Sequence, residues 1–258
     1  MSTDPKSIHS YNQYAEKWLE RIQGEEDVVH EYLDRPAMKK KLPKLKGKSV
    51  LCVGCGTGEE CAYLKSLGVK EVVGIDISEG QIKFAQKHFP NIRFYVMDME
   101  NISFPDNSFD FVYSSLTLHY VKDWTKTLKQ IYRLLRKGGT FLFSTHHPVK
   151  WGAETKRGKT AKSILLGYVE YKDGRKCEIF GDYLNVRKIK DIWFDEFEVV
   201  YYHKPFSSIM KDILNSGFRI VDFIEPKPLK EVRRKNLSFW QIRQKIPLFM
   251  IFELRKDL

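Results

Sequence analysis

The sequence lacks the features that mark membrane-spanning, secreted and low-complexity proteins. Its longest apolar runs, such as residues 248–252, are far too short to cross a bilayer. The N-terminal stretch has no apolar core of the kind a signal peptide needs, and its acidic residues argue against a transit peptide. No internal repeat or low-complexity tract is visible. These absences predict a globular, cytoplasmic protein with no membrane span.

Cysteine is scarce, with 4 residues in a chain of 258. Cys52 and Cys55 have CxxC spacing, which can indicate redox or metal chemistry. No second pair of ligands accompanies them, and they flank the end of a strand that we expect to be buried. We therefore predict no metal site and a reducing compartment.

Apolar and positively charged residues are plentiful. Hydrophobic residues make up 42% of the chain and aromatic residues 14%, which is enough for a packed core. The formal net charge is +11. Such a balance occurs in proteins that bind nucleic acid, membrane surfaces or anionic substrates, and also where a surface is merely rich in lysine.

Short apolar segments alternate with amphipathic ones through the middle of the chain. We expect helices at 59–68, 78–89 and 123–139, the last one ending at its glycine pair, and strands at 49–55, 71–77, 92–98, 109–115 and 140–145. This alternation predicts a parallel, doubly wound α/β sheet with both faces covered.

The two ends of the chain follow other patterns. Residues before 47 read as helices, with Tyr11, Tyr14 and Trp18 near one helical face. After residue 146 the pattern is mixed, and Asp173-Gly174 indicates a hairpin turn. A helix at 207–218 precedes strands at 219–226 and 247–255. These two strands have no helical crossover, which predicts an antiparallel pair at the sheet edge.

The strongest single feature is the segment VLCVGCGTG at residues 50–58, where a strand runs into a glycine-rich turn and then a helix. Gly54, Gly56 and Gly58 permit a sharp turn and the close approach of a ligand. Ligands of open α/β sheets bind beyond the carboxyl ends of the strands. The GxGxG spacing differs from the GxGxxG of dinucleotide folds, and the absence of GK[ST] excludes a P-loop. Taken alone, the glycines could also form a purely structural turn.

Two aspartates follow at the ends of successive strands. Asp76 lies about twenty residues beyond the glycine turn, where a carboxylate can accept both ribose hydroxyls of an adenosine. Asp98 is suited to the exocyclic amine of adenine, and Ile77 and Met99 could enclose the base. Each of these residues alone could equally be a helix cap or part of the core.

Together with residues 104–124 and 133–148, these segments resemble the successive motifs of class I S-adenosylmethionine-dependent methyltransferases. The nearest branch is the small-molecule one that includes the ubiquinone and menaquinone methylases. The resemblance extends from Tyr11 to Pro228 and is dense between Val50 and Pro148. It implies a Rossmann-like, doubly wound α/β fold with a seven-stranded, mostly parallel sheet and an antiparallel edge strand. An N-terminal helical lid and a small inserted cap complete that fold.

The resemblance implies a single methyltransferase domain over residues 1–258. Its expected parts are the N-terminal helical lid (1–47), the cofactor-binding core (48–148), the inserted substrate cap (149–205) and the C-terminal part of the sheet (206–258).

The resemblance also implies S-adenosyl-L-methionine as the cofactor, with the glycine turn along its methionine part. The residues expected to contact it are Gly54, Cys55, Gly56, Gly58, Asp76, Ile77, Gln81, Asp98, Met99, Ser115, Tyr14 and Trp18. The aromatic residues among them would close over the cofactor from the N-terminal helix, or would simply pack in the core. One departure is Cys52, which stands where the family usually has an acidic residue that supports the cofactor's amino end. Its loss would weaken binding or shift that support to the N-terminal helix.

The acceptor side depends on histidine. Methyl transfer from a sulfonium is an in-line displacement that needs alignment and a dry pocket, with a base only where the acceptor must lose a proton. The candidates are His119, His146, His147 and His203, of which we select His147 and His203, with Tyr183, as catalytic pocket residues. A structural hydrogen bond is the alternative for each. The many aromatic residues between 168 and 202 are suited to an apolar or aromatic small acceptor.

Other functions remain open at this point. Positive charge and the basic, aromatic stretch 227–245 would suit an RNA methyltransferase, although no RNA-binding module or RNA-enzyme motif accompanies them. Cys52 would suit a non-catalytic binding protein on the same fold. A nicotinamide-dependent dehydrogenase is disfavoured by the GxGxG spacing and Asp98. We predict a small-molecule methyltransferase, and the sequence names neither its acceptor nor its oligomeric state.

Overall fold

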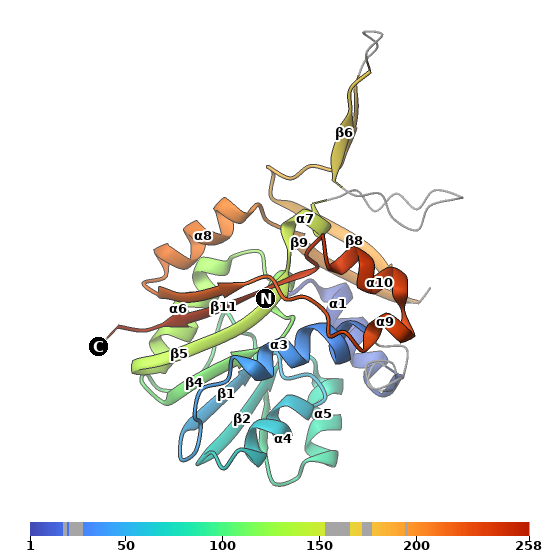
Figure 1. Cartoon of the computed structure of the whole chain (residues 1–258). Coiled ribbons are helices and arrows are strands. Elements are labelled where there is room, and N and C mark those ends of the chain that lie inside the picture. The colour runs from blue at the N-terminus through green and yellow to red at the C-terminus, as the bar shows by residue number, and fades with distance from the viewer. Residues whose placement is uncertain (18–19, 21–27, 153–165, 172–176, 194–195, 258) are drawn as a thin grey trace.

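A seven-stranded sheet forms the centre of the computed structural model, which describes residues 1–17, 20, 28–152, 166–171, 177–193 and 196–257 (Figure 1). The strand order is β10-β11-β5-β4-β1-β2-β3. The bounds are β1 Ser49–Val53, β2 Glu71–Asp76, β3 Arg93–Val96, β4 Phe109–Ser114, β5 Leu135–His146, β10 Arg219–Ile224 and β11 Phe249–Arg255. Strands β1 to β5 pair in parallel, and β11 is antiparallel to both of its neighbours. The predicted α/β fold is confirmed, including the antiparallel pair, in which β10 is the edge strand.

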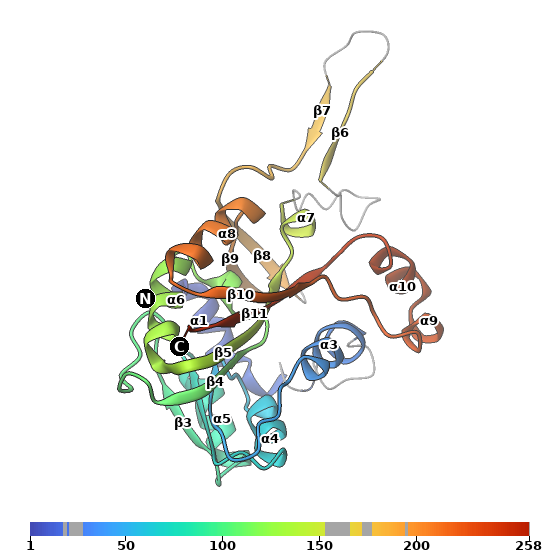
Figure 2. The same ribbon diagram turned by 60° about the vertical axis from the view of Figure 1, so that its left-hand side comes forward.

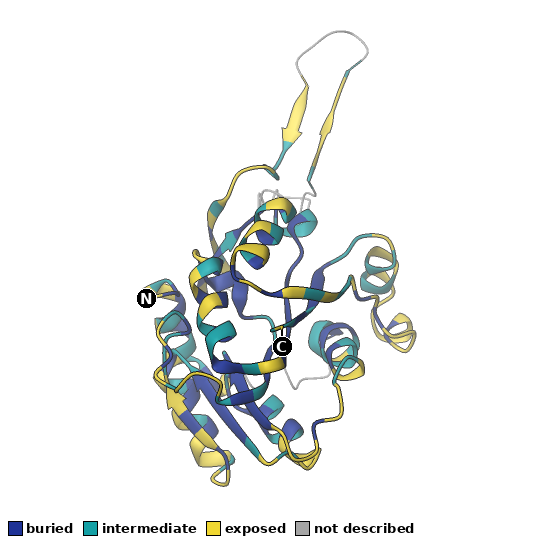
Figure 3. Ribbon diagram, turned by 90° about the vertical axis from the view of Figure 1, so that its left-hand side faces the viewer, coloured by how far each residue is buried: buried dark blue, intermediate teal, exposed yellow. Residues whose placement is uncertain are grey.

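Helices cover both faces of this sheet. Helices α6 (Trp124–Leu134) and α8 (Phe206–Asn215) pack on the face to which Leu51 points. On the opposite face, to which Val50 points, lie α3 (Arg35–Lys40), α4 (Glu59–Ser66) and α5 (Glu79–His88). Neighbouring residues of β1 thus serve opposite cores, as the two-residue period of a strand requires. Figure 2 shows the layers from the side, and Figure 3 shows the buried strands between them.

The prediction that a helix continues to Gly139 is wrong. Helix α6 ends at Leu134, and Leu135 already pairs with Phe109 of β4. Gly138, at a φ of 73°, donates its N–H to the carbonyl of Lys256 at 2.9 Å. Pairing with strands on either side therefore satisfies this backbone, and it overrides the helical pattern of the side chains.

The N-terminal region consists of helices that contact both the core and the cap. Helix α1 (Pro5–Gln13) begins earlier than the aromatic pattern predicted and ends just before Tyr14, while Trp18 lies outside the described residues. The Oδ1 atom of Asn12 accepts hydrogen bonds from Ser78 Oγ at 2.8 Å and Gly80 N at 3.0 Å. A π-helical turn, η1 (His30–Asp34), leads directly into α3. The hydrogen bonds of Asn12 attach helix α1 to the start of α5.

The region between β5 and α8 forms two small antiparallel sheets after the short helix α7 (Pro148–Trp151). Strands β6 (Gly167–Val169) and β7 (Glu178–Phe180) form the predicted hairpin, which projects from the body in Figures 1 and 2. Its turn at Asp173-Gly174 lies outside the described residues. Strands β8 (Arg187–Trp193) and β9 (Phe197–His203) pack close to α1, where Ser7 Oγ accepts from Val200 N at 2.8 Å.

Two short helices, α9 (Val232–Lys235) and α10 (Leu237–Arg243), occupy the basic stretch between β10 and β11. Just before them, the Leu229 N–H donates to the carbonyl of Tyr32 at 2.8 Å, so this stretch lies against the N-terminal region. Among the described residues no helix is both long and apolar enough to cross a membrane.

Candidate active site

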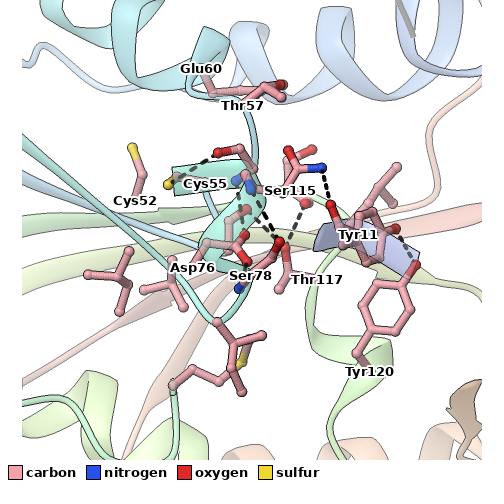
Figure 4. A pocket seen from close by; sticks show the side chains of 18 of the residues that line it. Tyr11, Cys52, Cys55, Thr57, Glu60, Asp76, Ser78, Ser115, Thr117 and Tyr120 are labelled. Atoms are coloured by element: carbon pink, nitrogen blue, oxygen red, sulfur yellow. Dashed lines mark hydrogen bonds between the residues drawn. The ribbon is translucent and has the colours of Figure 1, made fainter. Parts of the chain in front are cut away.

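A pocket of about 130 Å³ opens at the carboxyl ends of β1, β2 and β4 (Figure 4). The turn after β1, the end of β2 and the residues after β4 supply its floor, and α1 and η1–α3 supply further walls. Eight of the twelve expected cofactor residues line it: Gly54, Cys55, Gly56, Asp76, Ile77, Gln81, Met99 and Ser115. The fold thus brings together segments that are widely separated in the sequence.

The glycine turn divides into two parts. Gly54 and Gly56 have φ values of +66° and +52° and line the pocket. A Cβ on Gly56 would find only Gln81 Oε1, at 3.7 Å, so the space beside it belongs to the pocket. Gly58 is instead the N-cap of α4, and a Cβ there would lie 3.0 Å from the rings of Phe89 and Phe94. The structure therefore places Gly58 behind the pocket wall.

Asp76 is held rigidly by the backbone. Its Oδ2 accepts from Gly56 N at 3.0 Å and its Oδ1 accepts from Ser78 N at 2.9 Å. Burial raises the pKa of Asp76 above its ordinary value, against these hydrogen bonds. Each carboxylate oxygen keeps a further lone pair, so the oriented group can accept hydrogen bonds from hydroxyl groups of a ligand.

Asp98 already has partners on both oxygens. Its Oδ1 accepts from Glu100 N at 2.9 Å and its Oδ2 accepts from Ser2 N at 2.8 Å. Although burial acts in the opposite direction, these hydrogen bonds hold the pKa of Asp98 below its ordinary value. Asp98 does not line the pocket, whereas its neighbours Met97 and Met99 do. A ligand amine at Asp98 would approach Oδ2 beside the N–H of Ser2.

The ionisable groups that line the pocket are mainly acidic. Glu59, Glu60 and Asp76 line it, against one guanidinium, that of Arg35. Arg35 Nε lies 3.5 Å from Glu60 Oε1, and Glu59 accepts from Thr57 Oγ1 at 2.6 Å. This acidity stands out in a chain with a net charge of +11. Such a wall favours a cationic or zwitterionic ligand and disfavours a pyrophosphate.

Aromatic residues close the pocket on the side of α1. Tyr11 lines it, and its hydroxyl lies 2.7 Å from that of Tyr120. Tyr14 packs against Phe197 at 5.9 Å between ring centroids and does not line the pocket. Gln81 Nε2 donates to the Tyr11 carbonyl at 3.5 Å, while its buried Oε1 has no hydrogen-bond partner among the described residues. This oxygen lies beside the space at Gly56 and can accept a hydrogen bond from a polar ligand bound there.

The three residues selected as catalytic lie outside this pocket. His147 caps α7, because its Nδ1 accepts from Val149 N at 3.2 Å, and its Nε2 lies 2.7 Å from Glu225 Oε1. His203 donates from Nε2 to the Tyr183 carbonyl at 2.8 Å, and Tyr183 Oη accepts from Phe206 N at 3.3 Å. Both ring nitrogens of His147 are therefore in use, whereas the buried Nδ1 of His203 has no partner among the described residues.

A second group of rings adjoins the pocket. His119 and His146 stack at 3.5 Å, and Trp151 stacks on His146 at 3.8 Å. Within the part of the chain that the structure describes, both nitrogens of His119 and the Nδ1 of His146 are buried without partners. Burial lowers the pKa of His119 to about 3 and that of His146 well below its ordinary value. These two rings and His203 line a cavity of about 10 Å³, next to Tyr120 of the main pocket.

Sequence reasoning missed several residues of the site. Arg35 and Glu60 line the pocket, and Asp34 contacts it from behind. Glu60 follows the glycine turn and could have been inferred from position alone. Arg35 and Asp34 come from an irregular helical region with no motif, so only the tertiary fold brings them to the pocket.

Comparison with known proteins agrees with this geometry. Residues 51–143 match the methyltransferase domain family. A crystal structure of an S-adenosylmethionine-dependent methyltransferase from Mesorhizobium loti is similar, with a TM-score of 0.70 and 28% identity over 86% of this chain and 96% of that one. An uncharacterized protein of Haemophilus influenzae is 25% identical over 95% of each chain. A malonyl-[acyl-carrier protein] O-methyltransferase of Yersinia pestis is 35% identical over 38% of this chain and 37% of the relative.

The fold, the pocket at the strand ends and the matching domain define a methyltransferase of the Rossmann-like class. Within that class, residues 51–143 carry the methyltransferase domain, and the fold as a whole is similar to that of S-adenosylmethionine-dependent methyltransferases.

Proposed function

We propose that this chain transfers the methyl group of S-adenosylmethionine to a small-molecule acceptor by in-line displacement. When bound, the cofactor supplies a methyl group made electrophilic by its sulfonium. The observation that carries the proposal is the pocket itself, in which an oriented carboxylate, an open glycine turn and an acidic wall meet. Its net negative lining supports a cationic ligand over a nicotinamide dinucleotide, whose pyrophosphate would meet Glu59 and Glu60.

In this proposal, each part of the pocket holds one part of the cofactor. Asp76 accepts the ribose hydroxyls, and Ile77 and Met99 enclose the base. Gly54, Cys55 and Gly56 lie along the methionine part, with Gln81 and Ser115 beside it. The Arg35–Glu60 pair is suited to a ligand end that carries both a carboxylate and an ammonium. Asp98 takes the adenine amine beside the N–H of Ser2, and Tyr14 and Trp18 support the closing side.

We propose that the acceptor lies beside the stacked rings of His119 and His146. The unpaired, buried nitrogens there would gain partners from an acceptor with hydroxyl or carbonyl groups. A histidine with a pKa near 3 is a weak base, so His119 would orient the acceptor rather than take its proton. His203 lines the same cavity, and His147 and Tyr183 would support it from outside.

Two regions outside the core complete the proposal. Residues 1–47 act as the lid and 149–205 as the substrate cap within a single domain. The support is contact between them, since Tyr11 of the first region packs on Phe197 of the second at 4.9 Å. Aromatic rings thus enclose the space between cofactor and acceptor, which excludes water from the displacement.

The test is a calorimetric titration of the purified protein with S-adenosylmethionine, S-adenosylhomocysteine and NAD. We expect saturable binding of the first two alone. Asp76→Ala should weaken it by about a hundredfold, since two hydrogen bonds to a charged group are lost. Asp106→Ala, at an exposed carboxylate far from the pocket, is the matched control. Labelled methyl donor then reports the acceptor among small hydroxylated compounds, with RNA as the comparison.

No binding of either sulfur ligand would refute the proposal. Methyl incorporation into RNA alone would retain the cofactor but replace the acceptor.

A further inference from the structure

Asp34 is a carboxylic acid enclosed within the protein beside the main pocket. Its side chain is fully buried at the end of η1. Its Oδ2 accepts from Ser115 Oγ at 2.7 Å, and its Oδ1 has no hydrogen-bond partner among the described residues. A buried carboxylate with one oxygen unpaired is costly, because water no longer solvates its charge. Buried ionisable groups of this kind are enriched at functional sites.

Asp34 communicates with the pocket through a single side chain. Ser115 lines the pocket just after β4, and its Oγ donates a hydrogen bond to Asp34, which is not among the lining residues. The next residue, Leu116, has a φ of +49°, and its N–H donates to Ser144 of β5 at 3.1 Å. Non-glycine residues adopt such a conformation only where the surroundings enforce it, and they cluster at ligand sites. The carboxyl group of Asp34 therefore stands directly behind a constrained part of the pocket wall.

The charges around Asp34 do not neutralise it. Arg35 lies between Glu60 at 3.5 Å and Glu31 at 3.9 Å, so carboxylates already surround that guanidinium. The other ionisable groups that face Asp34 are His30, Glu60 and Tyr113. Burial raises the pKa of Asp34, and hydrogen bonds from Ser115 and Ser144 only partly oppose this. Without a ligand, burial thus makes the protonated acid more favourable than it is in water.

We propose that Asp34 is the buried counter-charge for the positive charge of the bound cofactor, and that binding this cation drives the Asp34 proton into solvent. The inference rests on the proposed function. S-adenosylmethionine has one positive charge more than S-adenosylhomocysteine, which has lost the sulfonium with the methyl group. Asp34 therefore favours the methyl donor over the demethylated product. The same charge loss on methyl transfer returns the proton to Asp34 and weakens product binding.

The sign of the pH dependence follows from this coupling. A positive charge in the pocket stabilises the ionised carboxylate, so the bound protein has a lower Asp34 pKa than the free protein. Protons are released on binding, and affinity for S-adenosylmethionine rises with pH until free Asp34 is ionised. S-adenosylhomocysteine, without the sulfonium, releases fewer protons and depends less on pH.

The experiment is calorimetry of both ligands in two buffers of different ionisation enthalpy, which counts the protons released. Asp34→Asn keeps an oxygen to accept from Ser115 but removes the charge, and it resembles the protonated acid, so the fold should persist. We expect its affinity for S-adenosylmethionine to fall about tenfold, which corresponds to one unit of differential pKa. Its affinity for S-adenosylhomocysteine should change far less, and the excess proton release should disappear.

The control is Asp110→Asn, which alters a carboxylate bound to Ser49 N at 2.8 Å and to Arg136, away from the pocket lining. It should bind both ligands as the original protein does. Equal proton release for the two ligands in the unaltered protein would overturn the inference without any variant. So would an unchanged ratio of the two affinities in Asp34→Asn. If the unaltered protein binds neither ligand, the proposed function fails first and this inference with it.

Discussion

Gly54 and Gly56 both have positive φ angles, yet alanine should affect them in different ways. A Cβ on Gly56 meets only the Gln81 Oε1 atom at 3.7 Å, so Gly56→Ala pays for backbone conformation alone. That strain is about 1–2 kcal/mol for a non-glycine residue in this region. A Cβ on Gly54 would lie 2.2 Å from Thr117 Cγ2, and Thr117 is held by its bond to the Ser115 carbonyl at 2.9 Å. Overpacking adds about 1–3 kcal/mol to the strain there.

Unfolding and binding measurements separate the two effects. With about 2–4 °C lost per kcal/mol, Gly56→Ala should lower the melting temperature by about 4 °C and Gly54→Ala by about 10 °C. Gly56→Ala should nevertheless weaken S-adenosylhomocysteine binding about tenfold or more, because its methyl group occupies pocket space.

A matched control tests whether strain alone explains the result. Gly217 has a φ of +88° and a Cβ position 3.4 Å from Tyr132, remote from the pocket lining. Gly217→Ala should therefore lower stability much as Gly56→Ala does and leave ligand affinity unchanged. Normal ligand affinity in Gly56→Ala would refute the assignment of this turn to the ligand.

Two further predictions concern the histidines. The His119 pKa is about 3 in the folded protein, below the usual value of 6.5. The stability that neutral His119 contributes is therefore complete above pH 6.5. It falls as the pH decreases, because acid then protonates His119 only in the unfolded chain. Between pH 7 and pH 5 this lowers the free energy of unfolding by about 2 kcal/mol. Chemical unfolding of His119→Phe should show a decrease that is smaller by this amount. Equal decreases in the two proteins would contradict a buried, neutral His119. For the acceptor side, His146→Ala and His203→Ala should lower methyl transfer about tenfold or more with S-adenosylhomocysteine affinity retained, and His147→Ala should act mainly through stability. Unchanged turnover in the first two variants would place the acceptor elsewhere.

The sequence was most informative where one short segment both forms an element and faces the ligand. The glycine turn and Asp76 are such cases, because strand ends of a parallel sheet meet at one edge whatever the loops do. The helix expected at 78–89 also forms as α5, and its N-cap Ser78 accepts at Oγ from Gln81 N at 3.2 Å. The sequence was least informative at the acceptor side. His119, His146 and His147 differ little in local pattern, but pairing with Val149 and Glu225 involves only His147.

Local patterns along the chain predicted the class of fold and the order of the core elements, and the resemblance to a methyltransferase family implied the cofactor. Periodicity and glycine spacing act over a few residues, so these features can be read along the chain. That Leu135 begins a strand follows from long-range contacts, because pairing with β4 outweighs helical propensity there. Long-range packing also brings Asp34 to Ser115 and Arg35 to Glu60 at the pocket. Charge and burial at that place arise from long-range packing, which no local pattern in the sequence encodes.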